Sequence, residues 1–348
     1  MNKKAIIATF TVAQVCTLLA TGNQTTLVSD ATEKASTLIN AIEPGNMMLA
    51  DYIKFGIKAE FLGTYEEKSF KDGSNENESD LVIDKIKMNL DIDVTENIKF
   101  DTNIEYKDGK DLYIDSAEFD ISLNDDLSIA VGKIDIPFGV FDGEMISDPL
   151  TKDLGEITQT TIGIIWKPVN SLKLSAWVYD SDIEGEINNA AAALEFKPSD
   201  AISLGVGIVS DICVGDLSDA IELEDDAEHD QTAGVNAWIA LNLTDSVSIL
   251  GEYISAIDNI DAINGDKPQT WAIDLVYEAT DAITIAARYE GSKEFLADET
   301  PESRVGGTLS YAFNDVVTLS AEYLYGKYDD AVEIDDCHLV SGRLVFGF

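Results

Sequence analysis

Acidic side chains are concentrated in residues 137–157, which read PFGVFDGEMISDPLTKDLGEI. Where carboxylates at this density line a narrow passage, they attract cations, repel anions and so select solutes by charge. The segment has one lysine to balance them. The acidic residues of this candidate filter are Asp142, Glu144, Asp148, Asp153 and Glu156.

The rest of the chain offers no catalytic or metal-binding set. Its only two histidines are His229 and His338, and no serine has an evident base beside it. Residues 211–231 hold nine acids and no Lys or Arg, but no metal-ligand spacing recurs among them. We therefore expect a solvated acidic loop there, and we predict no enzyme activity, no metal site and no cofactor.

Seven basic residues share the charged face of the predicted strands. If they lie opposite the acidic segment, they set a transverse electric field across a pore. The alternative is that they pair with acids of adjacent strands and neutralise the wall. The seven bases are Lys54, Lys58, Lys85, Lys87, Lys99, Arg288 and Arg343. The acids available on adjacent strands include Asp91, Asp101, Glu105, Glu118 and Asp120.

The elements that must position these residues are β-strands. Apolar and polar residues alternate with period two in segments of about ten to fourteen residues, as membrane strands require. In residues 98–106, for example, Ile98 and Phe100 share one face while Lys99 and Asp101 share the other. One face of each predicted strand is therefore apolar and the other is charged.

Short turns give the number of strands. A turn of Asn, Asp, Ser or Thr followed by an apolar residue occurs seven times, as TENIK, NDDLS, VNSLK, SDAIS, TDSVS, TDAIT and NDVVT. Such residues favour tight turns between antiparallel strands. Seven turns join fourteen strands, and one further strand at each end, near residues 51–64 and 337–348, makes sixteen. Longer connections, including residues 65–80 and 137–157, fall on the opposite side.

A ring of this size favours a membrane barrel over a soluble β-sandwich or propeller with the same alternation. Sixteen strands leave too wide an interior for a solid core, so the apolar face belongs outside against lipid and the lumen is polar. We predict an all-β, transmembrane, antiparallel up-and-down β-barrel of sixteen strands. Its third long loop, residues 137–157, is expected to fold into the lumen, either to narrow the pore or only to stabilise the mouth.

The amino terminus predicts export. Residues 1–22 have the basic start, apolar run and small-residue end of a signal peptide. Cys16 follows a valine, where lipoprotein processing needs a small residue, so a lipid anchor is disfavoured. We predict a short periplasmic segment at residues 23–48, with a helix as one possibility, and the barrel at residues 49–348. Both termini then lie in the periplasm.

The formal net charge of −42 suits cations and excludes nucleic acid as a partner. Beyond the signal, the two cysteines are Cys213 and Cys337. We expect packed free thiols, although an oxidising compartment permits one bridge. Outer-membrane lipid is the expected surrounding, and a homotrimer is compatible with the sequence.

Three short motifs lie in residues 132–157: PFG at Pro137–Gly139, SDPLT at Ser147–Thr151 and LGE at Leu154–Glu156. This series resembles the siderophore porins of the legiobactin-uptake (LbtU) family. The resemblance implies a sixteen-stranded outer-membrane barrel that imports a ferric siderophore without a plug domain. The terminal Phe348 also looks like the end signal by which the barrel-assembly machinery recognises outer-membrane proteins.

These observations predict a porin-like channel in the outer membrane of a Gram-negative bacterium. The first interpretation is uptake of small solutes, with a ferric siderophore as the solute. The second is a cation-preferring general diffusion porin, and the third is a structural or adhesive barrel. Saturable binding in the lumen would mark the first, conductance without saturation the second, and binding through the loops without conductance the third.

Overall fold

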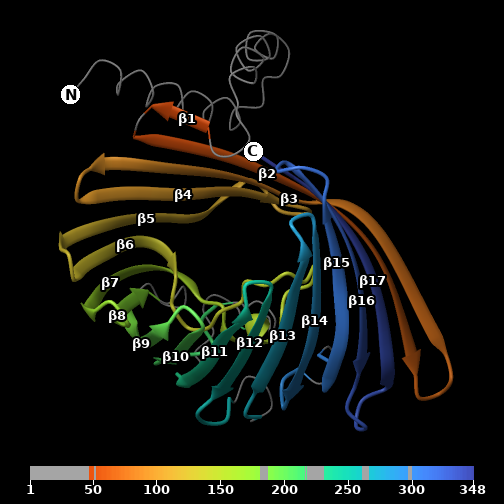
Figure 1. Cartoon of the computed structure of the whole chain (residues 1–348). Coiled ribbons are helices and arrows are strands. Elements are labelled where there is room, and N and C mark those ends of the chain that lie inside the picture. Colours follow the sequence, from red (N-terminus) through yellow and green to blue (C-terminus); the bar gives the residue numbers. More distant parts are fainter. Residues whose placement is uncertain are drawn as a thin grey trace. The chain divides into compact units, whose positions relative to one another are not determined.

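A closed β-barrel forms the described part of the chain (Figure 1). The computed structural model describes residues 47–50, 52–180, 187–215, 217, 231–260, 266–296 and 300–348. The sequence-predicted signal peptide, residues 1–22, and nearly all of the segment 23–48 lie outside these residues. Residues 44–348 form one compact unit.

The barrel wall has sixteen antiparallel strands, as the turn pattern predicts. Consecutive strands pair with each other, and β17 pairs with β2 to close the ring. A short additional strand, β1 (Met47–Ala50), pairs with the start of β2. In chain order the wall strands are β2 (Ile53–Phe70), β3 (Asn75–Thr95), β4 (Ile98–Lys107), β5 (Tyr113–Asn124), β6 (Leu127–Asp135), β7 (Thr158–Val169), β8 (Leu172–Asp180), β9 (Ile187–Ser199), β10 (Ile202–Val209), β11 (Gly234–Thr244), β12 (Val247–Ala256), β13 (Gln269–Thr280), β14 (Ile283–Lys293), β15 (Ser303–Ala312), β16 (Val317–Lys327) and β17 (Ile334–Gly347).

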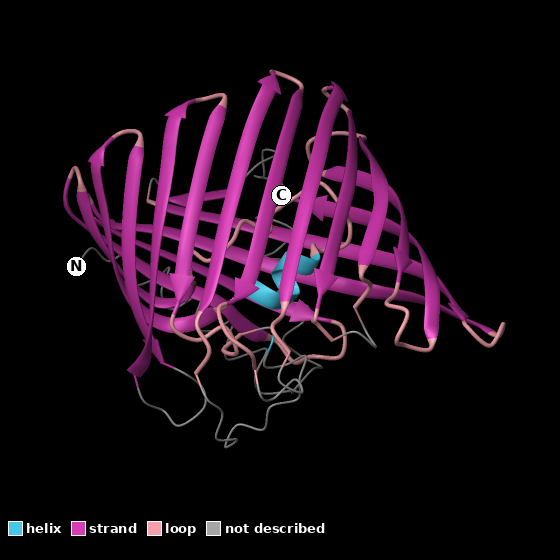
Figure 2. Cartoon of the chain, turned by 90° about the horizontal axis from the view of Figure 1, so that it is seen from below, coloured by secondary structure: helices cyan, strands magenta, loops and turns pink. Residues whose placement is uncertain are grey.

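The seven predicted tight turns each join two consecutive strands, beginning with β3 and β4 and ending with β15 and β16. They lie on one rim of the barrel, and longer connections lie on the other (Figure 2). The prediction of a long loop at residues 65–80 is wrong, because β2 continues to Phe70 and β3 begins at Asn75. A compact turn replaces the loop, since the Asp72 carboxylate accepts a hydrogen bond from the Ser74 amide at 2.8 Å.

Side chains alternate between the two faces of the wall. In β13, Ile273 and Leu275 are exposed on the outside, whereas Thr270, Ala272 and Asp274 are buried on the inside. The outward face of the barrel is therefore largely apolar, which is the pattern that contact with lipid requires.

No helix among the described residues is long and apolar enough to cross a membrane.

The interior is not uniformly polar, contrary to the expectation from strand alternation. The connection at residues 136–157, together with residues 211–215 and Leu217, carries apolar side chains inward, where they pack on inward residues of β6, β8, β9, β10 and β12. Phe138 and Leu154 of the first connection, for example, join one buried cluster with Trp177 of the wall. The loops thus build a core on one side of the ring that the strands alone cannot form.

The opposite side of the ring keeps polar inward side chains in contact with solvent. Asn89 of β3 is exposed, and Asp101 and Asn103 of β4 are partly exposed. The space left open inside the barrel is therefore lined by polar groups along this wall.

Strands β5 and β6 approach closely at one glycine. Gly132 has a φ of +149°, and a Cβ atom placed there would lie 1.9 Å from the carbonyl oxygen of Ala117 on β5. Only glycine accepts both this backbone conformation and this separation. The pairing of the two strands on this wall therefore depends on Gly132.

Replacing Gly132 by alanine is expected to lower the free energy of unfolding by about 1–3 kcal/mol, because the backbone is strained and the strands must separate. Gly342→Ala is the matched control, since no atom lies within 4 Å of a Cβ placed at that strand position. The measurement is the urea midpoint of the refolded proteins, followed by tryptophan fluorescence. Equal midpoints for the two variants would contradict the close approach.

Candidate functional site

The internal loop, residues 136–157, leaves β6, enters the barrel and returns to β7. It contains a short helix, α3 (Leu150–Gly155), which contacts β12, β13 and β14 and lies within the ring of strands (Figure 2). The N-cap residue is Pro149, which makes no side-chain capping bond. The first N–H groups of the helix therefore need partners from outside it.

Glu322 of β16 holds the middle of the loop. Its carboxylate accepts hydrogen bonds from the backbone N–H groups of Ile146, at 2.7 Å, and Ser147, at 3.1 Å. It also accepts from the Ser147 hydroxyl at 2.5 Å and from the Thr308 hydroxyl at 2.7 Å. One wall carboxylate thus fixes two successive residues of the loop.

Two further carboxylates hold the loop on either side of this point. Glu252 of β12 accepts a hydrogen bond from the Val140 N–H at 2.6 Å. Glu290 of β14 accepts from the Leu150 N–H at 2.7 Å, which supplies a partner for the start of α3. Because Glu252, Glu290 and Glu322 lie on alternate strands, they form a row of acceptors along the inner wall.

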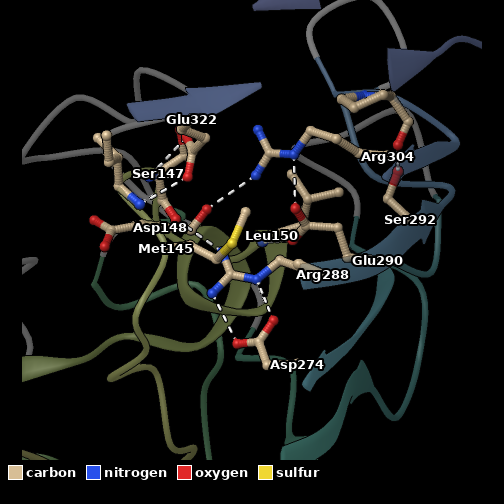
Figure 3. Close-up of polar contacts among 12 residues, drawn as sticks. Met145, Ser147, Asp148, Leu150, Asp274, Arg288, Glu290, Ser292, Arg304 and Glu322 are labelled. Atoms are coloured by element: carbon tan, nitrogen blue, oxygen red, sulfur yellow. Dashed lines mark hydrogen bonds and ion pairs between the residues drawn. The ribbon is translucent and has the colours of Figure 1, made fainter. Parts of the chain in front are cut away.

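Two arginines hold the carbonyl groups of the same segment (Figure 3). Arg288 of β14 forms a two-pronged ion pair with Asp274, at 2.6 and 2.9 Å, and donates to the Ser147 carbonyl at 2.8 Å. Arg304 of β15 donates to the Asp148 carbonyl at 2.9 Å. The wall therefore binds both the donors and the acceptors of the loop backbone.

Burial makes these contacts hard to break. Glu290 is 0% exposed, and Glu252, Asp274, Arg288 and Glu322 are each 6% exposed or less. A buried charge that loses its partner costs about 3–5 kcal/mol. Arg304 completes the network, since its Nε atom lies 2.7 Å from Glu290. The loop is thus held in one place by groups that have no favourable alternative inside the barrel.

Two of the predicted filter acids, Asp142 and Glu144, take no part in this anchoring. Both are exposed, and neither forms a hydrogen bond or ion pair with another described residue. Asp153 is exposed on α3. The carboxylates of Asp142 and Glu144 are therefore open to solvent inside the barrel.

The other two filter acids, Asp148 and Glu156, flank Lys152. The Lys152 ammonium lies 2.9 Å from Asp148 and 3.4 Å from Glu156. Burial raises the pKa of the Asp148 carboxyl group, but the nearby positive charges of Lys152, Lys85 and Arg288 together lower it by more, so the pKa falls below its ordinary value. Asp148 is therefore ionised at neutral pH.

Four of the predicted basic residues pair with acids on the part of the wall that does not anchor the loop. Glu105 of β4 is 1% exposed and lies 3.7 Å from Lys85 and 4.0 Å from Lys87. Lys107 joins it at 3.4 Å, and Lys87 also lies 3.2 Å from Asp115. The other two of these four bases, Lys58 and Arg343, lie beside a second buried carboxylate.

That carboxylate is Glu60 of β2, which lies 2.9 Å from Lys58 and 3.5 Å from Arg343. With Arg288 on Asp274, five of the seven predicted bases therefore pair with acids of the wall. Lys54 and Lys99 are exposed and form no ion pair with a described residue. The charges of this wall nearly cancel, and a transverse field between wall and loop stays a prediction.

Of the residues that anchor the loop, Arg288 is predicted from the sequence as a base of the inner wall, whereas Arg304 and the three carboxylates, Glu252, Glu290 and Glu322, were missed. The signal available was a charged residue beside an outward tyrosine in mid-strand, as in Glu252-Tyr253, Tyr289-Glu290 and Glu322-Tyr323. Alternation places each of these acids inside the barrel. What the sequence does not reveal is that their partners are backbone groups of a loop far away in the chain.

Within the described residues, no group of three or more His, Cys, Asp or Glu side chains is placed to hold a metal ion. Most of the acidic segment 211–231 lies outside those residues. Cys213 and Cys337 are free and buried. Burial raises the pKa of the Cys213 thiol to about 12, so this thiol is uncharged.

The fold is similar to that of solved porin-type barrels. The structure of the outer membrane channel DcaP of Acinetobacter baumannii matches with a TM-score of 0.59 and 12% identity, over 87% of this chain and 100% of that chain. An anion-selective porin from Comamonas acidovorans matches with a TM-score of 0.62 and 9% identity, over 85% and 99%. Salmonella typhi OmpF in complex with daunomycin matches with a TM-score of 0.59 and 11% identity, over 87% and 100%. No protein-family model and no curated protein sequence matches the chain.

Trypsin tests the anchoring, because Lys152 is the one tryptic site in residues 136–157. Glu322→Gln replaces an acceptor carboxylate with an amide, and the lost hydrogen bonds cost about 1–3 kcal/mol. We expect cleavage after Lys152 to speed up by about five- to a hundredfold, because the loop leaves the wall more often.

The control is Glu278→Gln, an exposed strand acid at the short-turn rim that has no contact with the loop. Its cleavage rate should match that of the unchanged protein. Equal rates for Glu322→Gln and the unchanged protein would mean that Glu322 does not hold the loop.

Proposed function

We propose that this protein is a porin in the outer membrane of a Gram-negative bacterium, where it forms a water-filled channel for small solutes. The observation that carries the proposal is a closed ring with an apolar outside, a charged inside and a loop fixed within it. Lipid requires that every backbone N–H and C=O group of the wall be paired, which a closed barrel provides. The fold similarity to porin-type barrels supports the proposal.

The internal loop sets where solutes pass. Its apolar side chains fill the side of the lumen formed by β6 to β12, and its anchors lie on β12 to β16. Solutes then move along the remaining wall, between α3 and the polar inner faces of β2 to β5. The exposed carboxylates of Asp142, Glu144 and Asp148 border this route.

We propose a ferric siderophore as the solute, on the strength of the motif series in the loop. Several motif residues serve as anchors: Phe138 is buried in the apolar cluster, Ser147 binds Glu322, and Leu150 binds Glu290. The motifs therefore support a loop conformation shared with the siderophore porins. That this protein also takes up a ferric siderophore is a further step of the proposal, and a binding experiment tests it.

A cation-preferring general diffusion porin is the second candidate, and the charge of the lumen favours it. The loop carries five acids against one lysine, and the opposite wall is nearly neutral. Carboxylates that border a water-filled passage raise the local concentration of cations. An anionic ferric siderophore would need the bases of that wall to offset this repulsion.

Neutralising the loop tests the role of its carboxylates. The triple variant Asp142→Asn, Glu144→Gln, Asp148→Asn is expected to lower the cation/anion permeability ratio by about fivefold, since three charges near the route contribute about 1 kcal/mol in a water-filled lumen. The measurement is the reversal potential in a potassium chloride gradient across a planar bilayer.

The matched control removes three acids from the short turns, as Asp245→Asn, Asp281→Asn, Asp315→Asn. These residues lie on the rim, so the same change in net charge should leave the reversal potential nearly unchanged. If both triple variants shift it equally, the loop acids do not line the narrow part of the route.

Titration with a ferric siderophore separates the two candidates. A solute-specific porin is expected to show ion current that falls to a plateau as a ferric carboxylate siderophore is added, because the ligand occupies a site in the lumen. The iron-free siderophore is the control. Current that is indifferent to every ferric siderophore would support general diffusion, and the absence of any current would contradict the channel itself.

A further inference from the structure

An apolar hollow lies on the outward face of the barrel, on the side away from the lumen. It has a volume of about 800 Å³ and extends across β7 to β10, which Figure 1 draws in green. Its floor is the pair Ala176 and Ala192, both exposed to the outside. Its existence follows from the strand register.

Cross-strand pairing places large and small side chains in two neighbouring rows. In the first row, Ile164 pairs with Ala176, Ala176 with Ala192, and Ala192 with Ile208. Two methyl groups thus lie between two isoleucines, which are 47% and 46% exposed. The second row, nearer the short turns, is Trp166, Leu174, Leu194 and Val206, again as direct pairs.

One end of the hollow lies at the short-turn rim. At that end it is bordered by Asn124 and Asp126 in the turn between β5 and β6. The backbone of this turn is held to β7, because the Lys167 N–H donates to the Asp126 carbonyl at 2.7 Å. An apolar trough with a polar end matches the division of a phospholipid into chain and headgroup.

We infer that the hollow holds one acyl chain of a phospholipid, with its headgroup beside Asn124 and Asp126. The inference rests on the proposed membrane location, which makes the outward face continuous with lipid. A rigid depression in that face either is filled by a flexible chain or remains a void that loses its van der Waals contacts. The phospholipid belongs to the leaflet at the short-turn rim, where the polar end lies.

A second copy of this chain fits the hollow less well. A specific protein interface uses roughly 20–30 residues on each side, so a partner barrel would have to contact the wall well beyond the fourteen residues that line the hollow. A partner barrel would also have to present a narrow ridge that matches the alanine floor. A single acyl chain needs neither a large area nor a matching surface.

Native mass spectrometry tests the inference on protein extracted from membranes in mild detergent. The unchanged protein is expected to retain one phospholipid, and to take it up again when phosphatidylethanolamine is added after delipidation. Ala176→Leu, Ala192→Leu fills the floor and should lower this occupancy by about tenfold. Ala287→Leu, Ala321→Leu is the matched control, because these two outward alanines lie on β14 and β16.

Loss of the phospholipid only in the hollow-filling variant would support the inference. Equal retention by both variants, or no retained phospholipid in the unchanged protein, would overturn it. Bilayer current recorded from the same preparations reports on the proposed channel separately, since the hollow lies outside the lumen. Current through the hollow-filling variant also establishes that the variant is folded.

Discussion

Closure of the ring at β17 and β2 is the contact on which the rest of the structure depends. The last residue takes part in it, because the Phe348 carbonyl accepts from the Ile57 N–H at 2.7 Å and the Phe348 N–H donates back at 2.9 Å. An open sheet of this size would leave two rows of unpaired backbone groups, which lipid does not tolerate. Closure also creates the enclosed interior in which a loop can be held by charged groups.

Within that interior, charge and burial work together. The carboxylates on β12, β14 and β16 are too deeply buried to remain unpaired, and the loop backbone satisfies them. The same loop covers apolar wall residues such as Trp177. The polar anchors thus set where the loop lies, while the apolar cluster stabilises that side of the barrel. The opposite wall pairs many of its own charges and keeps polar side chains in contact with solvent.

The sequence predicts the barrel well because its signals are local. The alternation of apolar and polar residues predicts which side chains face outward and which face the lumen. The recurring turn sequences give the number of strands. Prediction from the sequence fails where the outcome depends on distant partners. The pairing of Lys85 and Lys87 with Glu105 is within its reach, because Lys87 and Glu105 are direct partners on neighbouring strands and such pairing is one of the alternatives drawn from the sequence. The contact of Ser147 with Glu322 is not, because it follows from the path of the loop, which no local pattern encodes. The sequence predicts that the internal loop folds into the lumen, but it does not predict that Ile212, Val214 and Leu217 of a separate connection join the same apolar cluster.

We propose that the fixed internal loop forms the narrowest part of a conducting lumen. Single-channel conductance in the presence of polyethylene glycols of graded size tests it most directly, in the unchanged protein and in a variant that lacks residues 141–147. The unchanged protein is expected to form an open channel that excludes larger polymers, and the variant is expected to admit them. A closed barrel, or an unchanged size limit in the variant, would contradict it.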